Sequence, residues 1–179
     1  MINPLDVIDK YYSNNDKLRN LLLHHSWQVA TLALRCEAKH AEYKMDRNLI
    51  LRGSLLHDIG IFGTHAPSIG CYGTEHYLMH GFVGAQLLRE MGMEAEARIC
   101  ERHTGAGLSK DTIVKANLNI VQQDYYPETK EEMLICYADK FFSKSRPQAY
   151  LSFQEAYDSL LRFGQDQADR FKVWHDMFA

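Results

Sequence analysis

Apolar residues in this chain of 179 residues recur mainly at spacings of three and four positions, and alternating apolar and polar runs are scarce. Such spacing places apolar side chains on one face of an α-helix, whereas a half-buried strand requires alternation. We therefore expect an all-α fold, a compact helical bundle around one hydrophobic core. No repeat or linker demands a second unit, so residues 1–179 are expected to form a single domain.

Capping residues and glycine-rich breaks predict where the helices begin and end. Asp46 is expected to cap one helix, Ser109 or Asp111 is expected to cap another, and Thr129 with Glu132 has the spacing of a capping box. Irregular loops are expected around residues 63–79 and 104–111 because of their glycines. The last two helices are expected to pack on a core of about residues 18–145. The expected helices cover residues 4–12, 16–43, 46 to 60 or 63, 80–91, 94–103, a segment from 129, 148–163 and 165–178.

Charge and composition exclude several classes of protein. The 23 acidic and 20 basic side chains give a net charge of -3, and no basic stripe is present, so neither a nucleic-acid polymer nor an anionic membrane is an expected partner. No apolar run approaches the roughly 20 residues that span a bilayer, and the N-terminus lacks the pattern of a signal peptide. The four cysteines have no C-x-x-C spacing, so we expect reduced thiols in a cytoplasmic protein.

His57 and Asp58 stand side by side in the apolar run LLHDIGIF. A buried carboxylate without a partner is costly, so Asp58 needs a compensating group. Four further polar residues share helix faces with apolar ones: His25, His80, His103 and Asp139. A lone inward histidine is more often a hydrogen-bonded core residue, and a lone buried aspartate is more often a helix cap or half of an ion pair. One small core cannot easily satisfy six such groups separately. One or two divalent ions (Fe, Mn, Zn, Co or Ni) would satisfy them together, since these ions suit imidazole and carboxylate ligands.

These six residues and the segments around them resemble the HD superfamily of metal-dependent phosphohydrolases. They occur in the superfamily order H…HD…H…H…D, and LLHDIG matches its name-giving segment. The flanking segments HSWQVA, HGFVGAQLL, ERHTGAG and YADK agree as well, so the resemblance extends over residues 25–140. It implies a helical HD domain that holds metal at its centre.

The resemblance also implies how the ligands divide between two ions. Members of the superfamily that keep the two middle histidines usually bind two metals, and the aspartate of the doublet bridges them. Asp58 would then bridge one ion on His25, His57 and Asp139 and a second ion on His80 and His103. His80 is preferred to His76 because H-x-x-x-G-A matches the start of the family's helix. His76 is placed at the mouth of the pocket.

Two divalent ions can hold a hydroxide as nucleophile and neutralise charge on a phosphoryl group. The expected activity is therefore hydrolysis of a phosphate ester or anhydride in a small substrate, a nucleotide or dinucleotide. Asp58 and Lys140 are the expected catalytic residues, because the family commonly keeps a lysine after the last aspartate. The loop at 63–79 is a candidate lid. Further substrate contacts are predicted, with ordinary surface charge or a tight turn as the alternative, for Arg102, Thr104, His76, Lys110 and Lys144.

Differences from the superfamily's sequence motifs limit which of its branches this chain can resemble. Thr104 follows His103, and the HHE…GYP pattern is absent, which disfavours the cyclic dinucleotide phosphodiesterases of that branch. The segments HTGAG and ADK are similar to small stand-alone members such as the diadenosine tetraphosphate hydrolases. Two alternatives stay open: a di-iron oxygenase of the same superfamily that acts on an organophosphonate or polyol, and a regulatory or binding domain with a structural metal. A homodimer is also left open.

Overall fold

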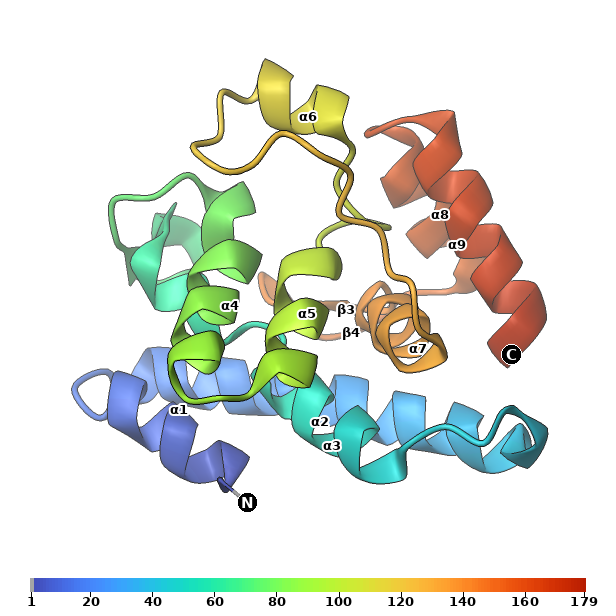
Figure 1. Cartoon of the computed structure of the whole chain (residues 1–179), viewed down its shortest axis with the longest axis horizontal. Coiled ribbons are helices and arrows are strands. Elements are labelled where there is room, and N and C mark those ends of the chain that lie inside the picture. The colour runs from blue at the N-terminus through green and yellow to red at the C-terminus, as the bar shows by residue number, and fades with distance from the viewer. Residues whose placement is uncertain (1) are drawn as a thin grey trace.

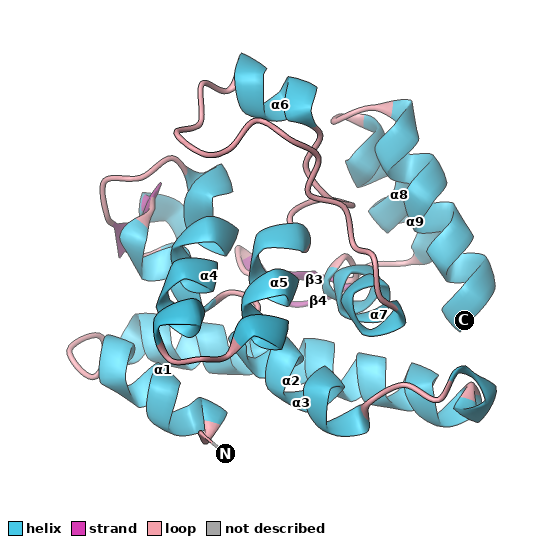
Figure 2. Cartoon of the chain, in the orientation of Figure 1, coloured by secondary structure: helices cyan, strands magenta, loops and turns pink. Residues whose placement is uncertain are grey.

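The computed structural model describes residues 2–179, and helices dominate this part of the chain (Figures 1 and 2). Strands form two short antiparallel pairs, β1 (His65–Ala66) with β2 (Cys71–Tyr72) and β3 (Phe142–Ser143) with β4 (Arg146–Tyr150). The expected all-α class is confirmed. The helices are α1 (Pro4–Tyr12), α2 (Asp16–Lys39), α3 (Arg47–Leu56), α4 (His80–Glu90), α5 (Glu94–Arg102), α6 (Lys110–Lys115), α7 (Lys130–Asp139), α8 (Phe153–Leu161) and α9 (Gln165–Phe178), with short 3-10 turns between some of them.

Several helices begin at the predicted capping side chains. Asp46 accepts hydrogen bonds from two backbone N–H groups in the first turn of α3, at 2.9 and 3.1 Å. Thr129 and Glu132 form the reciprocal capping box of α7, and Ser109 caps α6. These side chains satisfy first-turn donors that have no partner within the helix. Helix starts could therefore be read from local sequence.

Two predicted helix ends are wrong by a few residues. The second helix stops at Lys39, and residues 41–43 form a separate 3-10 turn. Helix α3 stops at Leu56, so the histidine–aspartate doublet lies in the turn that leads to a 3-10 helix, η2 (Ile59–Gly63). The doublet thus sits at a helix end, where the backbone changes direction toward the centre of the molecule.

The helix predicted over 148–163 is wrong in its first part. Residues up to Tyr150 form strand β4, which pairs with β3 across a turn at Lys144 and Ser145. Helix α8 begins only at Phe153, where Ser152 supplies a capping box with its third helical residue. The physical reason is that this capping box fixes the start of the helix, while the backbone before it is bound to β3.

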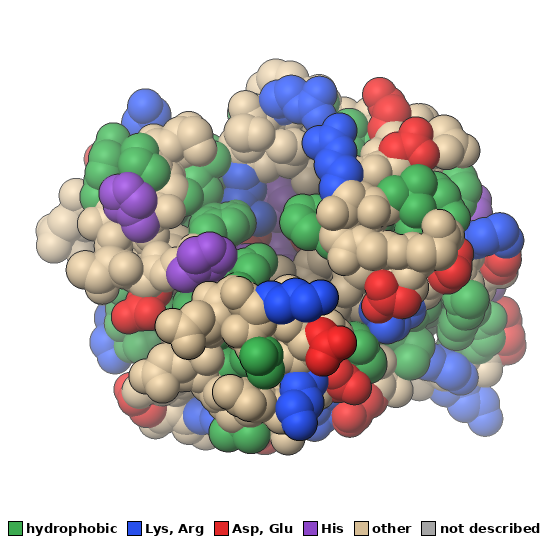
Figure 3. All heavy atoms as spheres, turned by 90° about the horizontal axis from the view of Figure 1, so that it is seen from above, with side chains coloured by type: hydrophobic (Ala, Val, Ile, Leu, Met, Phe, Trp, Pro, Cys, Tyr) green, Lys and Arg blue, Asp and Glu red, His purple; other side chains and the backbone are tan. Residues whose placement is uncertain are grey.

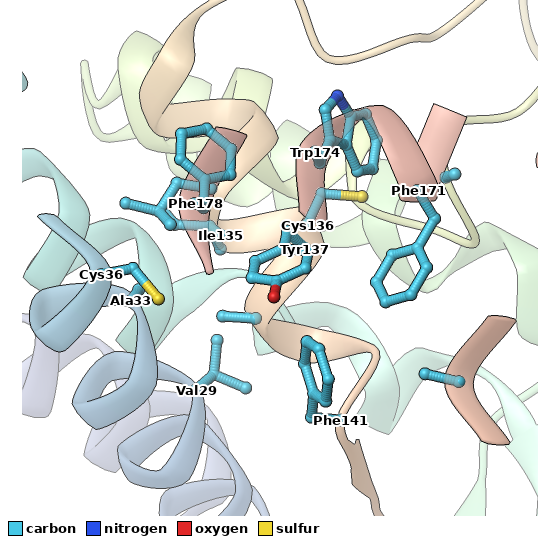
Figure 4. Packing of buried hydrophobic residues seen from close by; sticks show 14 of the residues in the cluster. Val29, Ala33, Cys36, Ile135, Cys136, Tyr137, Phe141, Phe171, Trp174 and Phe178 are labelled. Atoms are coloured by element: carbon cyan, nitrogen blue, oxygen red, sulfur yellow. The ribbon is translucent and has the colours of Figure 1, made fainter. Parts of the chain in front are cut away.

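Buried apolar side chains form two main clusters, and the polar doublet lies where they meet. The larger cluster joins α2, α3, α5, α7, α8 and α9 (Figure 4). The C-terminal helices belong to it, since the ring of Phe171 lies 5.4 Å from that of Tyr137 and 5.7 Å from that of Phe141. The second cluster joins α1, α2, the end of α3, η2, β2, α4 and α5. Among residues 2–179, no helix has the length and apolar character needed to cross a bilayer.

Candidate metal centre

Six buried polar side chains converge between the two clusters. They are carried by α2, by the turn after α3, by the first residue of α4, by the C-cap of α5 and by the last residue of α7. None of them is more than 6% exposed. The structure therefore brings together all six residues predicted as metal ligands: His25, His57, Asp58, His80, His103 and Asp139.

Asp58 lies between two pairs of imidazoles, and each of its oxygens faces one pair. Oδ2 lies 3.2 Å from Nε2 of His25 and 3.1 Å from Nε2 of His57. Oδ1 lies 3.4 Å from Nε2 of His80 and 3.3 Å from Nε2 of His103. One carboxylate is thus shared by two groups of nitrogen ligands.

Asp139 completes the first of these groups. Its Oδ1 lies 2.9 Å from Nε2 of His25 and 3.5 Å from Nε2 of His57. Within each group the candidate ligand atoms lie within 4.8 Å of one another. The first group has four members and the second has three, with Asp58 in both.

Helix ends orient the imidazole rings. In His57, His80 and His103, Nδ1 lies 2.6–2.7 Å from the backbone carbonyl oxygen three residues earlier in the chain. These carbonyls belong to Ser54, Tyr77 and Cys100, respectively. The carbonyls of Ser54 and Cys100 lie in the last turns of α3 and α5, where carbonyl groups lack an intrahelical partner and are free to accept the Nδ1 proton. The carbonyl of Tyr77 lies in the 3-10 turn before α4 and also accepts the backbone N–H of His80. The bond to each carbonyl assigns the proton to Nδ1 and leaves the Nε2 lone pair aimed at the centre, as metal-ligating histidines require.

The donors face a common point, and in the described part of the chain Asp58 is the member of the cluster whose oxygens lack hydrogen-bond partners. Among the described residues, neither oxygen of Asp58 accepts a hydrogen bond of suitable geometry. Nε2 of His80 lies 3.0 Å from Nε2 of His103, and the same atoms of His25 and His57 lie 3.3 Å apart. Because His80 and His103 hold their protons on Nδ1, their Nε2 lone pairs repel each other at this distance, and a cation between them removes the repulsion. This set of nitrogen and oxygen donors therefore fits divalent transition-metal ions.

The two groups differ in their charge. Burial lowers the pKa of His57, but the Asp58 and Asp139 carboxylates outweigh burial and raise it to about 9. Burial and the neighbouring His103 lower the pKa of His80 to about 3. Burial also lowers the pKa of His103. The second pair of histidines is thus neutral at pH 7, which is the form that binds metal.

Two lysines compensate the carboxylates. Nζ of Lys144 lies 2.5 Å from Oδ2 of Asp58, and Nζ of Lys140 lies 2.7 Å from Oδ2 of Asp139. Burial alone would raise the pKa of each carboxyl group, but the lysines hold the pKa of both well below its usual range. Burial opposes the lysine charges, yet the paired carboxylates raise the pKa of both lysines. Both lysines are therefore cations at neutral pH.

Two cavities open beside the cluster, and both are lined by Lys140 and Lys144. The first, of about 310 Å³, reaches His80 and His103 and has apolar walls; we call it the apolar cavity, and its walls include Leu78, Leu108, Leu160 and Phe163. The second, of about 440 Å³, we call the basic cavity, and its walls include Ser68, Ser143, Lys144, Ser145 and Arg146. A hollow in the face shown in Figure 3 has basic and histidine side chains in its depth.

Comparison with known proteins gives this chain a family. The HD domain family matches residues 22–143, and this range includes all six converging side chains. The chain belongs to the HD domain family. Domains of this family bind divalent metals, and the buried histidine and aspartate cluster of this HD domain has the ligands to hold them.

Two relatives are similar in sequence to this HD domain. An uncharacterized protein of Methanocaldococcus jannaschii is 36% identical over 129 residues, covering 68% of this chain and 69% of the relative. A tRNA (cytidine(56)-2'-O)-methyltransferase of Thermoplasma volcanium is 32% identical over 173 residues. That match covers 96% of this chain but 44% of the methyltransferase, so the HD domain spans less than half of that relative.

Similar solved structures agree with the fold. The HD domain of the L. monocytogenes phosphodiesterase PgpH has a TM-score of 0.59 at 21% identity, covering 96% of this chain and 94% of that one. The same domain in complex with cyclic-di-AMP has a TM-score of 0.57 at 22% identity, covering 96% and 92%. At this level of identity the likeness shows the HD fold alone.

Some residues predicted to contact substrate line the cavities of the HD domain. Thr104 lines the apolar cavity, and its buried Oγ1 has no hydrogen-bond partner within residues 2–179. Lys140 and Lys144 line both cavities. The segment 63–79 supplies Tyr77 to both walls. Its role as a lid stays a prediction.

Three other predicted substrate contacts lie elsewhere. The guanidinium of Arg102 donates to the carbonyl of Tyr126 at 2.7 Å and to Glu128 at 2.9 Å. His76 accepts a hydrogen bond from a backbone N–H two residues later, in the 3-10 turn before α4. Lys110 is the exposed first residue of α6. The structure gives these three residues local structural contacts, and their substrate roles stay predictions.

Proposed function

We propose that this HD domain is a metal-dependent phosphohydrolase that cleaves a phosphate ester or anhydride of a nucleotide or dinucleotide. One observation carries the proposal: Asp58 is shared by two ligand groups beside Lys140 and Lys144, which line both cavities. Membership of the HD family and the likeness to the fold of a phosphodiesterase support it. The proposed cofactors are two divalent ions, held by His25, His57, Asp58 and Asp139 and by Asp58, His80 and His103.

Bound ions would supply Lewis acidity and an activated water. The chain itself supplies positive charge for the non-bridging oxygens of the phosphoryl group. Lys140 and Lys144 are only 14% and 12% exposed, so water screens their charges weakly. Their two charges balance those of Asp58 and Asp139, and divalent ions would therefore leave a net positive centre. Such a centre matches a phosphate group and the charge that develops on it.

Thr104 offers a polar contact inside the apolar cavity. Its hydroxyl is buried and lacks a partner among the described residues, and buried polar groups normally have one. A phosphate oxygen or a sugar hydroxyl of the substrate would satisfy it. This residue therefore belongs to the proposed substrate site.

The test begins with elemental analysis of protein purified without added metal. A panel of nucleotides is then assayed for phosphate release with Mn, Co, Ni, Zn or Fe. We expect metal-dependent release that His57→Ala abolishes and His40→Ala preserves, since His40 lies at the end of α2 outside the cluster. A metal-loaded protein that hydrolyses no phosphorylated compound would contradict the proposal.

Assays on the same metal-loaded protein distinguish the phosphohydrolase from the two alternative functions. A di-iron oxygenase acting on an organophosphonate or polyol would consume oxygen with its substrate and show a mixed-valent iron signal. A regulatory domain with a structural metal would bind a ligand saturably without converting it. A phosphohydrolase releases phosphate without oxygen uptake, so an oxygen electrode beside the phosphate assay discriminates all three.

A further inference from the structure

We propose that the substrate lies across both cavities, with an aromatic base against Phe163 in the apolar cavity and a second phosphate at Arg146 in the basic cavity. The inference rests on the proposed function and deepens it. It names the substrate class as a nucleoside diphosphate or a longer phosphate chain, in preference to a monophosphate.

The apolar cavity has the size and lining of a site for a planar apolar group. Its volume of about 310 Å³ lies at the lower end of the range for small-molecule sites. Leu78, Leu108 and Leu160 form much of the wall. Two metal-ligand histidines and Lys144 also line it, so a group bound there is next to the proposed reaction centre.

Phe163 stands at the rim of this cavity. It is 71% exposed although it is a large apolar side chain, and it lies in the turn between α8 and α9. The next residue, Gly164, has a φ of 139°, a backbone conformation that L side chains rarely adopt. The turn therefore presents the phenylalanine beside the cavity. Stacking of a base on an aromatic ring improves affinity about fivefold to a hundredfold.

The basic cavity has the lining of an anion site. Arg146, at the start of β4, lines it, and within the described residues this guanidinium forms neither an ion pair nor a side-chain hydrogen bond. Hydrogen bonds from Ser152 lower the pKa of Glu155, and Arg146 is near enough to that carboxyl group to add to this effect. Hydroxyl groups from Ser68, Ser143 and Ser145 line the same cavity. The single acidic residue in the lining, Asp139, is already paired with Lys140. A free guanidinium matches the geometry of a phosphate group better than an ammonium does.

The two cavities meet at the metal centre. Five residues line both of them: Tyr77, Asp139, Lys140, Lys144 and Ser159. A substrate that fills both cavities would therefore place its central phosphate beside Lys140, Lys144 and the ligand cluster. Because Phe163 lines only the apolar cavity and Arg146 only the basic cavity, the base and the second phosphate would occupy different cavities next to the cleaved phosphate.

The experiment compares three probes on the metal-loaded protein. They are ADP, AMP and ribose 5-phosphate, which differ by one phosphate and by the base. Arg146→Gln is expected to raise the KM for ADP about tenfold while the KM for AMP stays within about twofold, because a charge-assisted contact to the second phosphate is lost. Arg146→Lys, which keeps the charge but not the planar fork, should give a smaller increase.

Phe163→Ala tests the other end of the substrate. It is expected to raise the KM for ADP and AMP by about fivefold or more and to leave that for ribose 5-phosphate unchanged. Arg47→Gln and Val121→Ala are matched controls, because both positions are exposed and line neither cavity. Both controls should behave like the wild-type protein with all probes.

Titration calorimetry with α,β-methylene-ADP, which resists cleavage between its phosphates, measures the effect of Arg146→Gln on binding without turnover. An equal effect of Arg146→Gln on ADP and AMP, or none, would overturn the second-phosphate site. An equal effect of Phe163→Ala on ADP and ribose 5-phosphate would overturn the base site. Failure of the proposed function looks different: the wild-type protein would bind the nucleotides with the expected discrimination and release no phosphate from any of them.

Discussion

Asp58 is fully buried, and its two oxygens face different pairs of imidazoles at 3.1–3.4 Å. Lys144 provides the only lysine contact to it among the described residues, at 2.5 Å. Asparagine at this position would keep nearly the same volume but would replace one oxygen with an amide nitrogen that cannot bind a cation. The charge and the second oxygen are therefore the properties that a substitution should test.

Asp58→Asn is expected to lose at least one of two bound ions and to slow phosphate release by at least about 100-fold, since changes around metal ligands already cost 10- to 100-fold. Elemental analysis and the phosphate assay measure the two effects. Asp111→Asn is the control, because Asp111 is an exposed residue in the first turn of α6. Full metal content and an unchanged rate in Asp58→Asn would refute the shared-ligand assignment.

At the scale of elements, the contact between η2 and α4 sets the distance between the two ligand groups. A Cβ atom on Gly60 would lie 2.2 Å from the carbonyl oxygen of His80 and 2.3 Å from the backbone nitrogen of Gly84. The 3-10 helix after Asp58 therefore touches the backbone of α4 directly. This close approach brings the second pair of histidines to the carboxylate.

Gly60→Ala is expected to destabilise the protein by about 1–3 kcal/mol, because the added methyl group meets backbone atoms that cannot move independently. It should also lower the occupancy of the ion held by the second ligand group. Urea unfolding and metal analysis measure both.

Gly63→Ala is the matched control in the same 3-10 helix. There the nearest atom to the new Cβ is Cγ1 of Val83 at 3.1 Å, a side-chain atom that can shift. If both variants were equally stable and bound the same amount of metal, the proposed role of the close contact would be wrong.

At the scale of the whole molecule, the cluster joins helices that lie far apart in the sequence. Residues from His25 to Asp139 meet in it, and the two apolar clusters pack on either side. A ligand that binds the folded chain and not the unfolded one stabilises the fold by mass action. Metal ions at this position would therefore hold the entire bundle together.

Removal of metal by a chelator is expected to lower the Tm by about 5–10 °C, since an ion present at 100 times its Kd contributes about 2.7 kcal/mol. Differential scanning calorimetry measures the shift. His25→Ala should reduce the effect of the chelator, and His65→Ala should leave it unchanged, because His65 is exposed and outside the cluster. An identical Tm with and without chelator would argue against metal binding by the folded chain.

The sequence by itself determined the helical class, several helix starts and the candidate ligands. These features depend on interactions within a few residues: the spacing of apolar side chains, the capping oxygen of Asp46, and the capping box of Thr129 and Glu132. The buried doublet could be recognised because a charged group in an apolar run is physically unusual. Its helix end at Leu56 was predicted a few residues too late.

Only the tertiary structure decided what surrounds the ligands. Residues 148–150 belong to a strand, although a helix was expected there. The carbonyl of Pro147 in this strand lies 3.0 Å from Nε2 of His24 and accepts a hydrogen bond from Gln28 at 3.1 Å, both on α2. This hairpin brings Lys144 to Asp58 and Arg146 to the basic cavity. Such contacts join residues more than 80 positions apart, and no pattern within a helical turn specifies them. The identity of the ligands was therefore local information, whereas the two cavities that would select a substrate arise from long-range packing.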